Sequence, residues 1–504
     1  MRIILTLLIF YSAFTGGFAQ FGQLGEDLVG EFDFQQFGDI VKISGDGQTL
    51  MLTTRRSPDA FDRLDVRVYT LDGENWTPKG SPIIYLVPGG YSITDIDISH
   101  DGSIVAIGYP KGGAGVGRVR IYEFDGSEWF QLGEDLLSEE NFGSFGVGLG
   151  LSDDGRRIVI SDPLIDTPMS GREGNLVVFD YDGSAWNLVG EPIENNIRVG
   201  QLWYADISGD GNTVLTLTGH DEFGTSLGIY RIFDSEWIKI GQSFFSGYDW
   251  EQVGWMANLS YDGNFLVFGI PAYAEAAQAS FDGTFESYTY NADLDLWEMF
   301  GEPLDSGSDD IQWYGHGNAL SSDASVLAVM GYGQVAEKGK VFIYDRTDTS
   351  WELRPISYSG TLNHDLFGKS MSLDSTGETF VMSGRGGVNR RGFVKTYAEG
   401  VASDPDDTDP DDTDPDGDAT DVEENELVFS VFPNPVQDVL TLTFEVDKSF
   451  SKARVFNQLG QEVLVIEIES ELGATIDLSV LRQGLYYLRL ESESEVYQQT
   501  IIKN

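Results

Sequence analysis

Gly224, Ser226 and Gly228 form the first pattern in this chain that suggests chemistry, because they match the G-x-S-x-G elbow of serine hydrolases. That elbow requires a strand-to-helix turn in an α/β sheet. Here the pattern lies in a glycine-rich β segment, and no helical pattern follows it. We therefore interpret the match as a coincidence.

The remaining residues that could carry catalysis are also scattered. The histidines are His100, His220, His316 and His364. No two of them have metal-ligand spacing, so neither a histidine-rich zinc site nor a serine–histidine pair is indicated. The chain has no cysteine, which excludes disulfides, thiolate metal sites and a cysteine nucleophile. A glycosidase needs only two carboxylates, and among 82 acidic residues no pair stands out, so the sequence predicts no catalytic residue and no cofactor.

An acidic, proline-spaced segment at 400–426 contains a calcium-loop pattern, D-x-[DN]-x-[DN]-G-x5-E. Its candidate ligands are Asp412, Asp414, Asp416, Asp418 and Glu423. Pro415 interrupts the loop and no helices flank it. We therefore favour a solvated, disordered linker and keep weak calcium binding as the alternative.

Extra aromatic residues form the candidate binding set. They are Trp203, Tyr204, Trp250, Trp313 and Tyr314. Rings exposed on neighbouring repeats would offer a stacking platform for a glycan or a peptide. The alternative is that these rings pack between the repeats, as large aromatic side chains more often do.

The elements that must position these residues are repeats of roughly 55 residues. A tryptophan closes each of the first six units, at Trp76, Trp129, Trp186, Trp237, Trp297 and Trp351. A short turn recurs in step with it, at 44–47, 99–102, 152–155, 208–211, 260–263, 321–324 and 374–377. Asp-Gly between two apolar runs is typical of a tight hairpin, and a second turn precedes each tryptophan.

Seven units of four short antiparallel strands predict an all-β, seven-bladed β-propeller over residues 20–399. The last unit supplies only three strands, and residues 21–28 resemble residues 129–136 almost residue for residue. We therefore expect the N-terminal segment to supply the fourth strand of the last blade. A linear solenoid is the alternative, and it would leave both partial units unpaired.

The pairs Phe37-Gly38, Phe145-Gly146 and Phe367-Gly368 precede the first strand of their units and resemble FG-GAP repeats, which build the propeller of integrin α chains. Two features depart from that family. The first turn is a tight Asp-Gly turn where calcium-binding repeats carry an acidic loop, and the second and fourth units lack Phe-Gly. The resemblance therefore implies the fold without implying metal in the blades.

Propeller geometry places both Asp-Gly turns of a unit on one face and the long loops on the other. The long loops include 109–117, 163–174 and 271–283. Because binding residues are often carried by variable loops on a rigid scaffold, we expect a ligand on the long-loop face.

Both ends of the chain indicate export. Residues 1–19 carry an arginine, a short apolar run and small residues, which is typical of a secretory signal peptide, with a retained anchor as the alternative. We expect no transmembrane segment in the mature chain. The net charge of −51 argues against nucleic acid as a partner.

Residues 427–504 contain alternating apolar residues between turns and predict a small immunoglobulin-like β-sandwich. Several of its residues form motifs, namely Pro433, Asn434, Pro435, Gly460, Gly484, Tyr486 and Lys503. Together they closely resemble the type A C-terminal sorting domain of the type IX secretion system of Bacteroidetes. The resemblance implies the type IX machinery as partner, with the mature protein secreted or on the cell surface. A plain adhesive sandwich is the alternative.

The sequence thus favours an exported binding or adhesion propeller whose ligand is a glycan or a protein. A polysaccharide-directed hydrolase and a structural surface-layer component remain the alternatives.

Overall fold

The computed structural model describes residues 21–401 and 429–503, apart from short gaps. The gaps are 56–62, 87–94, 113–115, 138–144, 168–170, 195–199, 221–223, 246–255, 271–282, 307–310, 334–337, 362–363, 387–388, 433–438, 445–451, 458–461, 469–472, 483 and 492–495. The chain divides into two units, 1–412 and 413–504, which are described separately. The described residues contain strands and no α-helix, which confirms the all-β prediction.

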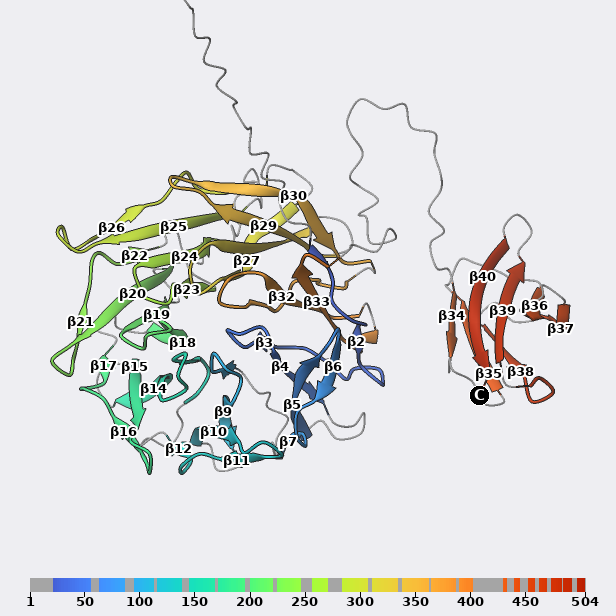
Figure 1. The fold of residues 1–504 in the computed structure, drawn as a ribbon, viewed down its shortest axis with the longest axis horizontal. Helices are drawn as coiled ribbons and strands as arrows, with labels where there is room; N and C mark the ends of the chain where they lie inside the picture. Colours follow the sequence, from blue (N-terminus) through green and yellow to red (C-terminus); the bar gives the residue numbers. More distant parts are fainter. Residues whose placement is uncertain are drawn as a thin grey trace, which may run out of the picture. The chain divides into compact units, whose positions relative to one another are not determined.

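Seven antiparallel sheets follow one another around a ring in the first unit (Figure 1). Each has four main strands in which neighbours along the sheet are hydrogen-bonded. Sheet 1 contains β3 (Val41–Ile43), β4 (Thr49–Arg55), β5 (Arg63–Asp72) and β6 (Asn75–Pro78); sheet 2 contains β8 (Ile96–Ile98), β9 (Ile104–Gly112), β10 (Val116–Phe124) and β11 (Trp129–Gln131). Sheet 3 contains β13 (Leu149–Leu151), β14 (Arg157–Thr167), β15 (Gly171–Tyr181) and β16 (Trp186–Leu188); sheet 4 contains β18 (Gly200–Ile207), β19 (Thr213–His220), β20 (Gly224–Phe233) and β21 (Glu236–Lys239).

The same order continues in the remaining sheets. Sheet 5 contains β23 (Ala257–Leu259), β24 (Phe265–Ile270), β25 (Thr284–Asn291) and β26 (Leu296–Met299); sheet 6 contains β27 (Ile311–Leu320), β28 (Val326–Gly333), β29 (Lys340–Arg346) and β30 (Trp351–Ser359). Sheet 7 contains β31 (Met371–Leu373), β32 (Thr379–Gly384), β33 (Phe393–Glu399) and β1 (Phe21–Gln23). Two-residue or four-residue strands extend five of the sheets, namely β2 (Leu28–Val29), β7 (Ile83–Leu86), β12 (Leu136–Leu137), β17 (Ile193–Glu194) and β22 (Phe244–Phe245).

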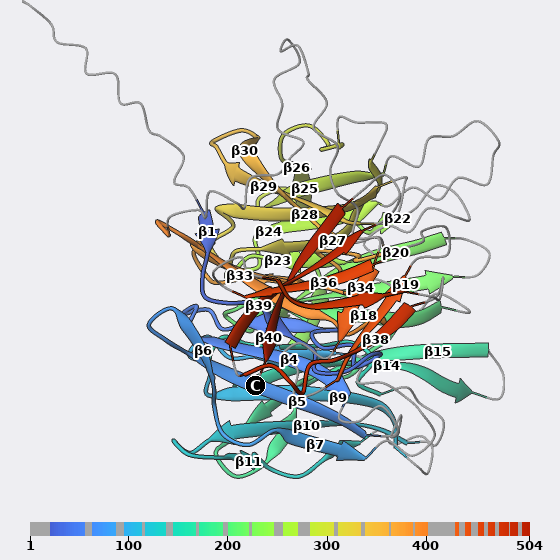
Figure 2. The same ribbon diagram turned by 90° about the vertical axis from the view of Figure 1, so that its right-hand side faces the viewer.

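The innermost strands form a closed cycle. In chain order β3, β8, β13, β18, β23, β27 and β31 each contact the next, and β31 contacts β3. In Figure 2 the strands β11 and β30, from sheets 2 and 6, lie at opposite edges of this arrangement. The chain therefore folds as a β-propeller, in which each sheet buries both faces against its neighbours.

The N-terminal strand β1 belongs to the last sheet. Phe21 pairs with Glu399 and Gln23 with Tyr397, the same place that β11 holds beside β10 in sheet 2. The Phe21 side chain is buried, and its ring lies 4.9 Å from the ring of Phe380. The first and last parts of the propeller are thus held in one sheet.

The repeated tryptophans join neighbouring sheets. Trp129 Nε1 donates to the carbonyl of Lys79 at 2.7 Å, and Trp186 Nε1 donates to the carbonyl of Leu132 at 2.8 Å. Across the ends of the ring, Trp76 of sheet 1 donates to Thr396 Oγ1 of sheet 7 at 2.9 Å. Each of these indoles therefore satisfies its polar N–H in the preceding sheet while its ring fills the boundary.

The second unit contains two antiparallel sheets around one apolar core. One sheet orders β34 (Phe429–Phe432), β35 (Val439–Phe444) and β38 (Gly473–Asp477); the other orders β37 (Glu462–Glu467), β36 (Lys452–Asn457), β39 (Gly484–Glu491) and β40 (Val496–Lys503). Leu440 and Ile476 from the first sheet share the core with Val455, Leu488 and Ile501 from the second. A two-sheet sandwich is the result, because alternate residues of every strand face the partner sheet.

Candidate binding site at the ring of turns

The first turn follows one hydrogen-bonding scheme in sheets 1 to 6, while in sheet 7 Asp374 takes the place of the serine. In sheet 1, Ser44 Oγ donates to Asp46 Oδ1 and accepts from the amide of Thr49, and Asp46 Oδ1 also accepts from the amide of Gln48. Gly47 has a φ of 69°, which a residue without Cβ adopts at little cost. The serine and the aspartate are thus used within the turn, leaving the residue between them free to vary.

These turns are joined into a circle, which we call the turn ring (44–47, 99–102, 152–155, 208–211, 260–263, 321–324 and 374–377). Seven backbone N–H groups donate across the sheet boundaries, one at each boundary. They are Asp46 to His100, His100 to Asp153, Asp153 to Gly209, Asp210 to Tyr261, Tyr261 to Ser322, Asp323 to Ser375 and Ser375 to Gly45. The ring fixes the second residue of each turn next to its counterparts in the neighbouring turns.

The second residues carry different side chains. They are Gly45, His100, Asp153, Gly209, Tyr261, Ser322 and Ser375. A Cβ placed on Gly209 would lie 2.5 Å from Tyr261 Cδ2 and 2.8 Å from Asp153 Oδ1. The side chains of Asp153 and Tyr261 therefore lean together over the position that glycine leaves empty.

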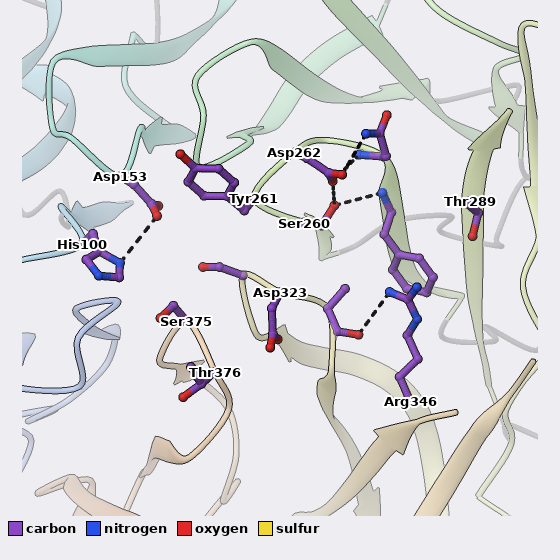
Figure 3. Close-up of a pocket in the computed structure, with 14 residues that line it drawn as sticks. His100, Asp153, Ser260, Tyr261, Asp262, Thr289, Asp323, Arg346, Ser375 and Thr376 are labelled. Carbon is purple, nitrogen blue, oxygen red and sulfur yellow. Dashed lines mark hydrogen bonds and ion pairs between the residues drawn. The ribbon is translucent and has the colours of Figure 1, made fainter. Parts of the chain in front are cut away.

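A cavity of about 640 Å³ opens at this ring (Figure 3). His100 and Asp153 line one end of it, Tyr261 and Ser375 line the middle, and Arg346 lines the other end. Its volume lies in the range of small-molecule pockets. We call it the turn pocket.

The end of the turn pocket at His100 and Asp153, which we call its inner end, holds a histidine–aspartate pair. His100 Nδ1 lies 3.6 Å from Asp153 Oδ2, and both side chains are partly exposed. Burial raises the pKa of Asp153; His100 opposes the shift, and nearby carboxylates such as Asp97 add to it. This end can accept and donate hydrogen bonds to hydroxyl groups, which carry both functions.

Tyr261 gives the middle of the pocket an exposed aromatic face. Half of its surface is accessible, which is unusual for a ring in a packed turn. Ser322, Ser375 and Thr376 add hydroxyl or backbone polar groups around it. An aromatic plane bordered by short polar side chains suits a ligand with an apolar face and a polar edge, such as a sugar ring.

A group of carboxylates lies on the innermost strands. Lys42 Nζ is 3.3 Å from Asp97 Oδ1. Burial lowers the pKa of Lys42, but Asp97, Asp95 and Asp206 outweigh it and raise the pKa overall. Burial raises the pKa of Asp95 and of Asp206 to about 7 in each case, with Lys42 opposing the shift.

Two of these carboxylates also accept hydrogen bonds from backbone amides on the edge of the next sheet. Asp95 Oδ2 and Asp97 Oδ2 accept from the amides of Leu149 and Leu151 in the next sheet, at 3.0 and 2.7 Å. An innermost strand has an unpaired edge, and such N–H groups need partners when they are buried. We therefore assign these carboxylates a structural role in joining neighbouring sheets.

The predicted aromatic set is dispersed in the structure. Tyr314 is fully buried, its hydroxyl 2.5 Å from that of Tyr344, so we remove it from the proposed binding surface. Tyr204 is partly buried, and burial raises its pKa well above the usual value. Trp250 and the side chain of Trp203 lie outside the described residues.

Trp313 is partly exposed and packs on its own strand. Its ring centroid lies 6.2 Å from that of His316, which in turn lies 5.0 Å from Tyr332. Burial lowers the pKa of His316 to about 4, so this imidazole is neutral at pH 7 and acts as a packing group. Trp313 thus keeps only part of its surface for a ligand.

The G-x-S-x-G pattern does not form a strand-to-helix elbow. Ser226 lies within β20, where it pairs with Thr218 and Phe245, so the elbow geometry is lacking. Within the described ranges no group of three or more potential ligands could hold a metal ion. The calcium-pattern residues at 412–423 lie outside those ranges.

The predicted sorting residues fall partly within the second unit's sheets. Gly484 pairs with Lys503, and Tyr486 pairs with Ile501, between β39 and β40. Tyr486 donates its hydroxyl to the carbonyl of Arg482 at 2.9 Å. The predicted residues at 433–435 and 460 lie outside the described residues.

The sequence interpretation missed the turn pocket. It treated the Asp-Gly turns as scaffold and looked for binding on the opposite face. The signal was present in the second residue of each turn, which changes from copy to copy while its neighbours repeat. Arg346 carried no comparable signal, because it lies outside the turn motif.

A comparison with known protein families identifies the second unit. Residues 430–504 match the sequence family described as the secretion system C-terminal sorting domain. No curated protein matches the chain. In the part of the chain that the structure describes, there is no helix of the length and apolarity needed to span a membrane.

Similar solved structures include Kuenenia stuttgartiensis hydrazine synthase, at 12% identity and a TM-score of 0.47, covering 71% of this chain and 94% of that one. The β-propeller domain of the Trilobed protease from Pyrococcus furiosus aligns at 12% identity and 0.46, covering 73% and 96%. A putative 6-phosphogluconolactonase from Bacteroides uniformis aligns at 10% and 0.45, covering 67% and 89%. These values identify neither a family nor a ligand for the propeller.

The match at 430–504 confirms the predicted sorting domain. A chain that carries it interacts with the type IX secretion machinery and is exported to the cell surface or beyond. Residues 430–504 of this chain belong to the C-terminal sorting domains of the type IX secretion system.

Proposed function

We propose that this protein is an exported binding protein whose seven sheets act as the seven blades of a closed propeller. The turn ring supports the blade count, since its seven hydrogen bonds pass through every sheet and return to the first. We further propose that the acidic segment at 400–426 is a linker between the propeller and the sorting domain.

The observation that carries the binding function is the turn pocket. It combines an exposed ring at Tyr261, short polar side chains and the pair His100–Asp153 in about 640 Å³. A glycan is the ligand class that this combination favours, because a sugar ring has an apolar face and a hydroxyl edge. A protein ligand on the long-loop face, with Trp203, Trp250 and Trp313, remains the second candidate.

A glycan array with the purified full-length mature chain tests this proposal. Tyr261→Ala should weaken binding of any captured glycan at least tenfold, since an aromatic stacking contact contributes about 1 kcal/mol beyond the buried area. Phe233→Ala is the matched control, because Phe233 is exposed to a similar degree on β20 and does not line the pocket.

Three results would contradict the proposal. Equal binding by the wild type and Tyr261→Ala would move the site elsewhere, and shortening of the bound glycan at turnover rates would favour the hydrolase alternative. Self-association without any glycan ligand would favour the structural surface-layer alternative.

A further inference from the structure

Arg346 stands out among the described arginines of the propeller. Most of the others pair with a carboxylate, for example Arg118 and Arg120 with Asp135, Arg156 with Glu123, Arg157 with Asp180, Arg354 with Asp345, and Arg391 with Asp33. No ion pair joins Arg346 to any carboxylate in the described part of the chain. With 82 acidic residues against 31 basic ones, an unpaired guanidinium is unexpected.

The guanidinium of Arg346 is nevertheless held in place. Its central carbon lies 4.3 Å from the ring centroid of Phe265 and 5.2 Å from that of Phe300. Phe265 is buried in the core between sheets 5 and 6. Stacking on a fixed ring removes much of the freedom that an exposed arginine would lose on binding a ligand.

Most of the hydrogen-bonding capacity of Arg346 is unused. The one hydrogen bond of its guanidinium within the described residues is a long contact of 3.5 Å from Nη1 to the carbonyl of Ala324. Arg231, by contrast, donates to Thr213, to the carbonyl of Gly263 and to Asn264. Arg346 lines the turn pocket with most of its guanidinium donors unused, and a guanidinium matches a planar or tetrahedral oxyanion.

We propose that the turn pocket recognises an acidic glycan, whose carboxylate or sulfate group pairs with Arg346 while a sugar ring lies on Tyr261. This inference depends on the proposed function, because it specifies the ligand of the same pocket. The remaining hydroxyls of the glycan meet the polar inner end at His100 and Asp153.

The net charge of −51 does not prevent this recognition. Charges on the surface are screened beyond about 8 Å at physiological salt, so the groups inside the pocket decide the interaction. Burial raises the pKa of Asp262, but hydrogen bonds from Ser260 and Asn264 outweigh burial and lower the pKa overall, so this carboxylate stays charged. The same bonds hold both of its oxygens within the turn. Asp323 is partly occupied, since its Oδ1 accepts from Ser321 and Ser325.

Calorimetry with the full-length mature chain tests the inference, using a tetrasaccharide of alginate, a sulfated carrageenan tetrasaccharide and the neutral laminaritetraose. One acidic probe should bind at least tenfold more tightly than the neutral one, and its affinity should fall as salt rises. Arg346→Gln should remove that preference. Arg156→Gln is the matched control, because Arg156 also lies over an aromatic ring, Tyr181, but is already paired with Glu123.

The outcomes separate this inference from the proposed function. Binding of laminaritetraose as tight as that of the acidic probes, or an unchanged preference in Arg346→Gln, would overturn the acidic-glycan inference and leave a glycan-binding pocket. Wild-type binding without salt dependence would overturn it as well, and this readout does not depend on how the variant folds. Absence of binding by all three probes and by the glycan array would overturn both.

Discussion

At the scale of single residues, two sets of carboxylates in this propeller experience opposite environments. Asp182, in an exposed turn, accepts hydrogen bonds from Ser184, Ala185 and Asn187, and these bonds lower its pKa. Asp206 lies near Asp97, a partly buried carboxylate of the innermost strands, and burial raises the pKa of Asp206 to about 7. Ionised Asp182 therefore stabilises the folded protein, whereas ionised Asp206 destabilises it.

Asp206→Asn should therefore stabilise the protein at neutral and alkaline pH. Between about pH 4 and 7 an unfolded Asp206 is ionised while the folded one stays protonated, so the wild type loses stability as the pH rises through this window. The asparagine does not titrate and can still accept from the amide of Leu259. We expect a gain of about 1–3 kcal/mol at pH 8 and little change at pH 4, measured by thermal unfolding.

The control reverses the sign. Asp182→Asn should lower stability at pH 7 and have little effect at a pH where the wild-type carboxyl is protonated in both states, because the lowered pKa of Asp182 marks a stabilising carboxylate. If Asp206→Asn destabilised the protein equally at every pH, the amide contact would outweigh the charge, and our account of the group would be wrong.

At the scale of elements, the turn ring includes glycines that have no space for a side chain. A Cβ on Gly263 would lie 2.3 Å from Thr213 Oγ1 and 2.4 Å from Thr213 Cβ, in the neighbouring hairpin. Gly73, in an outer turn with nearly the same positive φ, has nothing within 4 Å. Both positions require a positive φ, but only Gly263 is closely packed against a neighbour.

Gly263→Ala should therefore cost more stability than Gly73→Ala. The positive φ alone costs about 1–2 kcal/mol at either site, and the overlap with Thr213 adds about 1–3 kcal/mol at Gly263. Urea unfolding of both variants measures the difference. Equal losses would show that the hairpins move apart freely. Ala324, which has a φ of 57° at the same position in sheet 6, shows that the turn itself accepts a methyl group where the neighbour allows it.

The hairpins could be predicted because they depend on local residues. Asp-Gly turns and alternating apolar residues specify each strand pair without reference to the rest of the chain. The turn pocket could not be predicted in this way, since His100, Tyr261 and Ser375 come from different sheets and meet only after the ring has formed. The burial of Tyr314 was equally hidden, because its partner Tyr344 lies on another strand.

At the scale of the whole molecule, the two ends of the propeller meet in sheet 7. Phe21 is 1% exposed and lies 4.6 Å from the guanidinium carbon of Arg354, which itself pairs with Asp345 of sheet 6. The strand β1 thus contacts the sheet before its own as well as β33. The second unit, by contrast, was identified from sequence because its motifs lie within one short segment.

Phe21→Ala should destabilise the propeller by about 3–5 kcal/mol, the usual loss for a buried phenylalanine. Phe130→Ala is the control, because Phe130 lies in the corresponding strand β11 and is 57% exposed. Thermal unfolding of both variants measures the difference. If the two losses were the same, β1 would not hold the ring closed.

The pairing of Phe21 with Glu399 also sets an order of events. The first strand of the propeller has its place in the last sheet of the propeller, so β1 must wait for some 370 further residues before it finds its partner. A chain that has only partly crossed a membrane therefore cannot complete the ring. Closure of the ring thus requires the whole propeller segment, from Phe21 to Glu399, to be on the same side of the membrane.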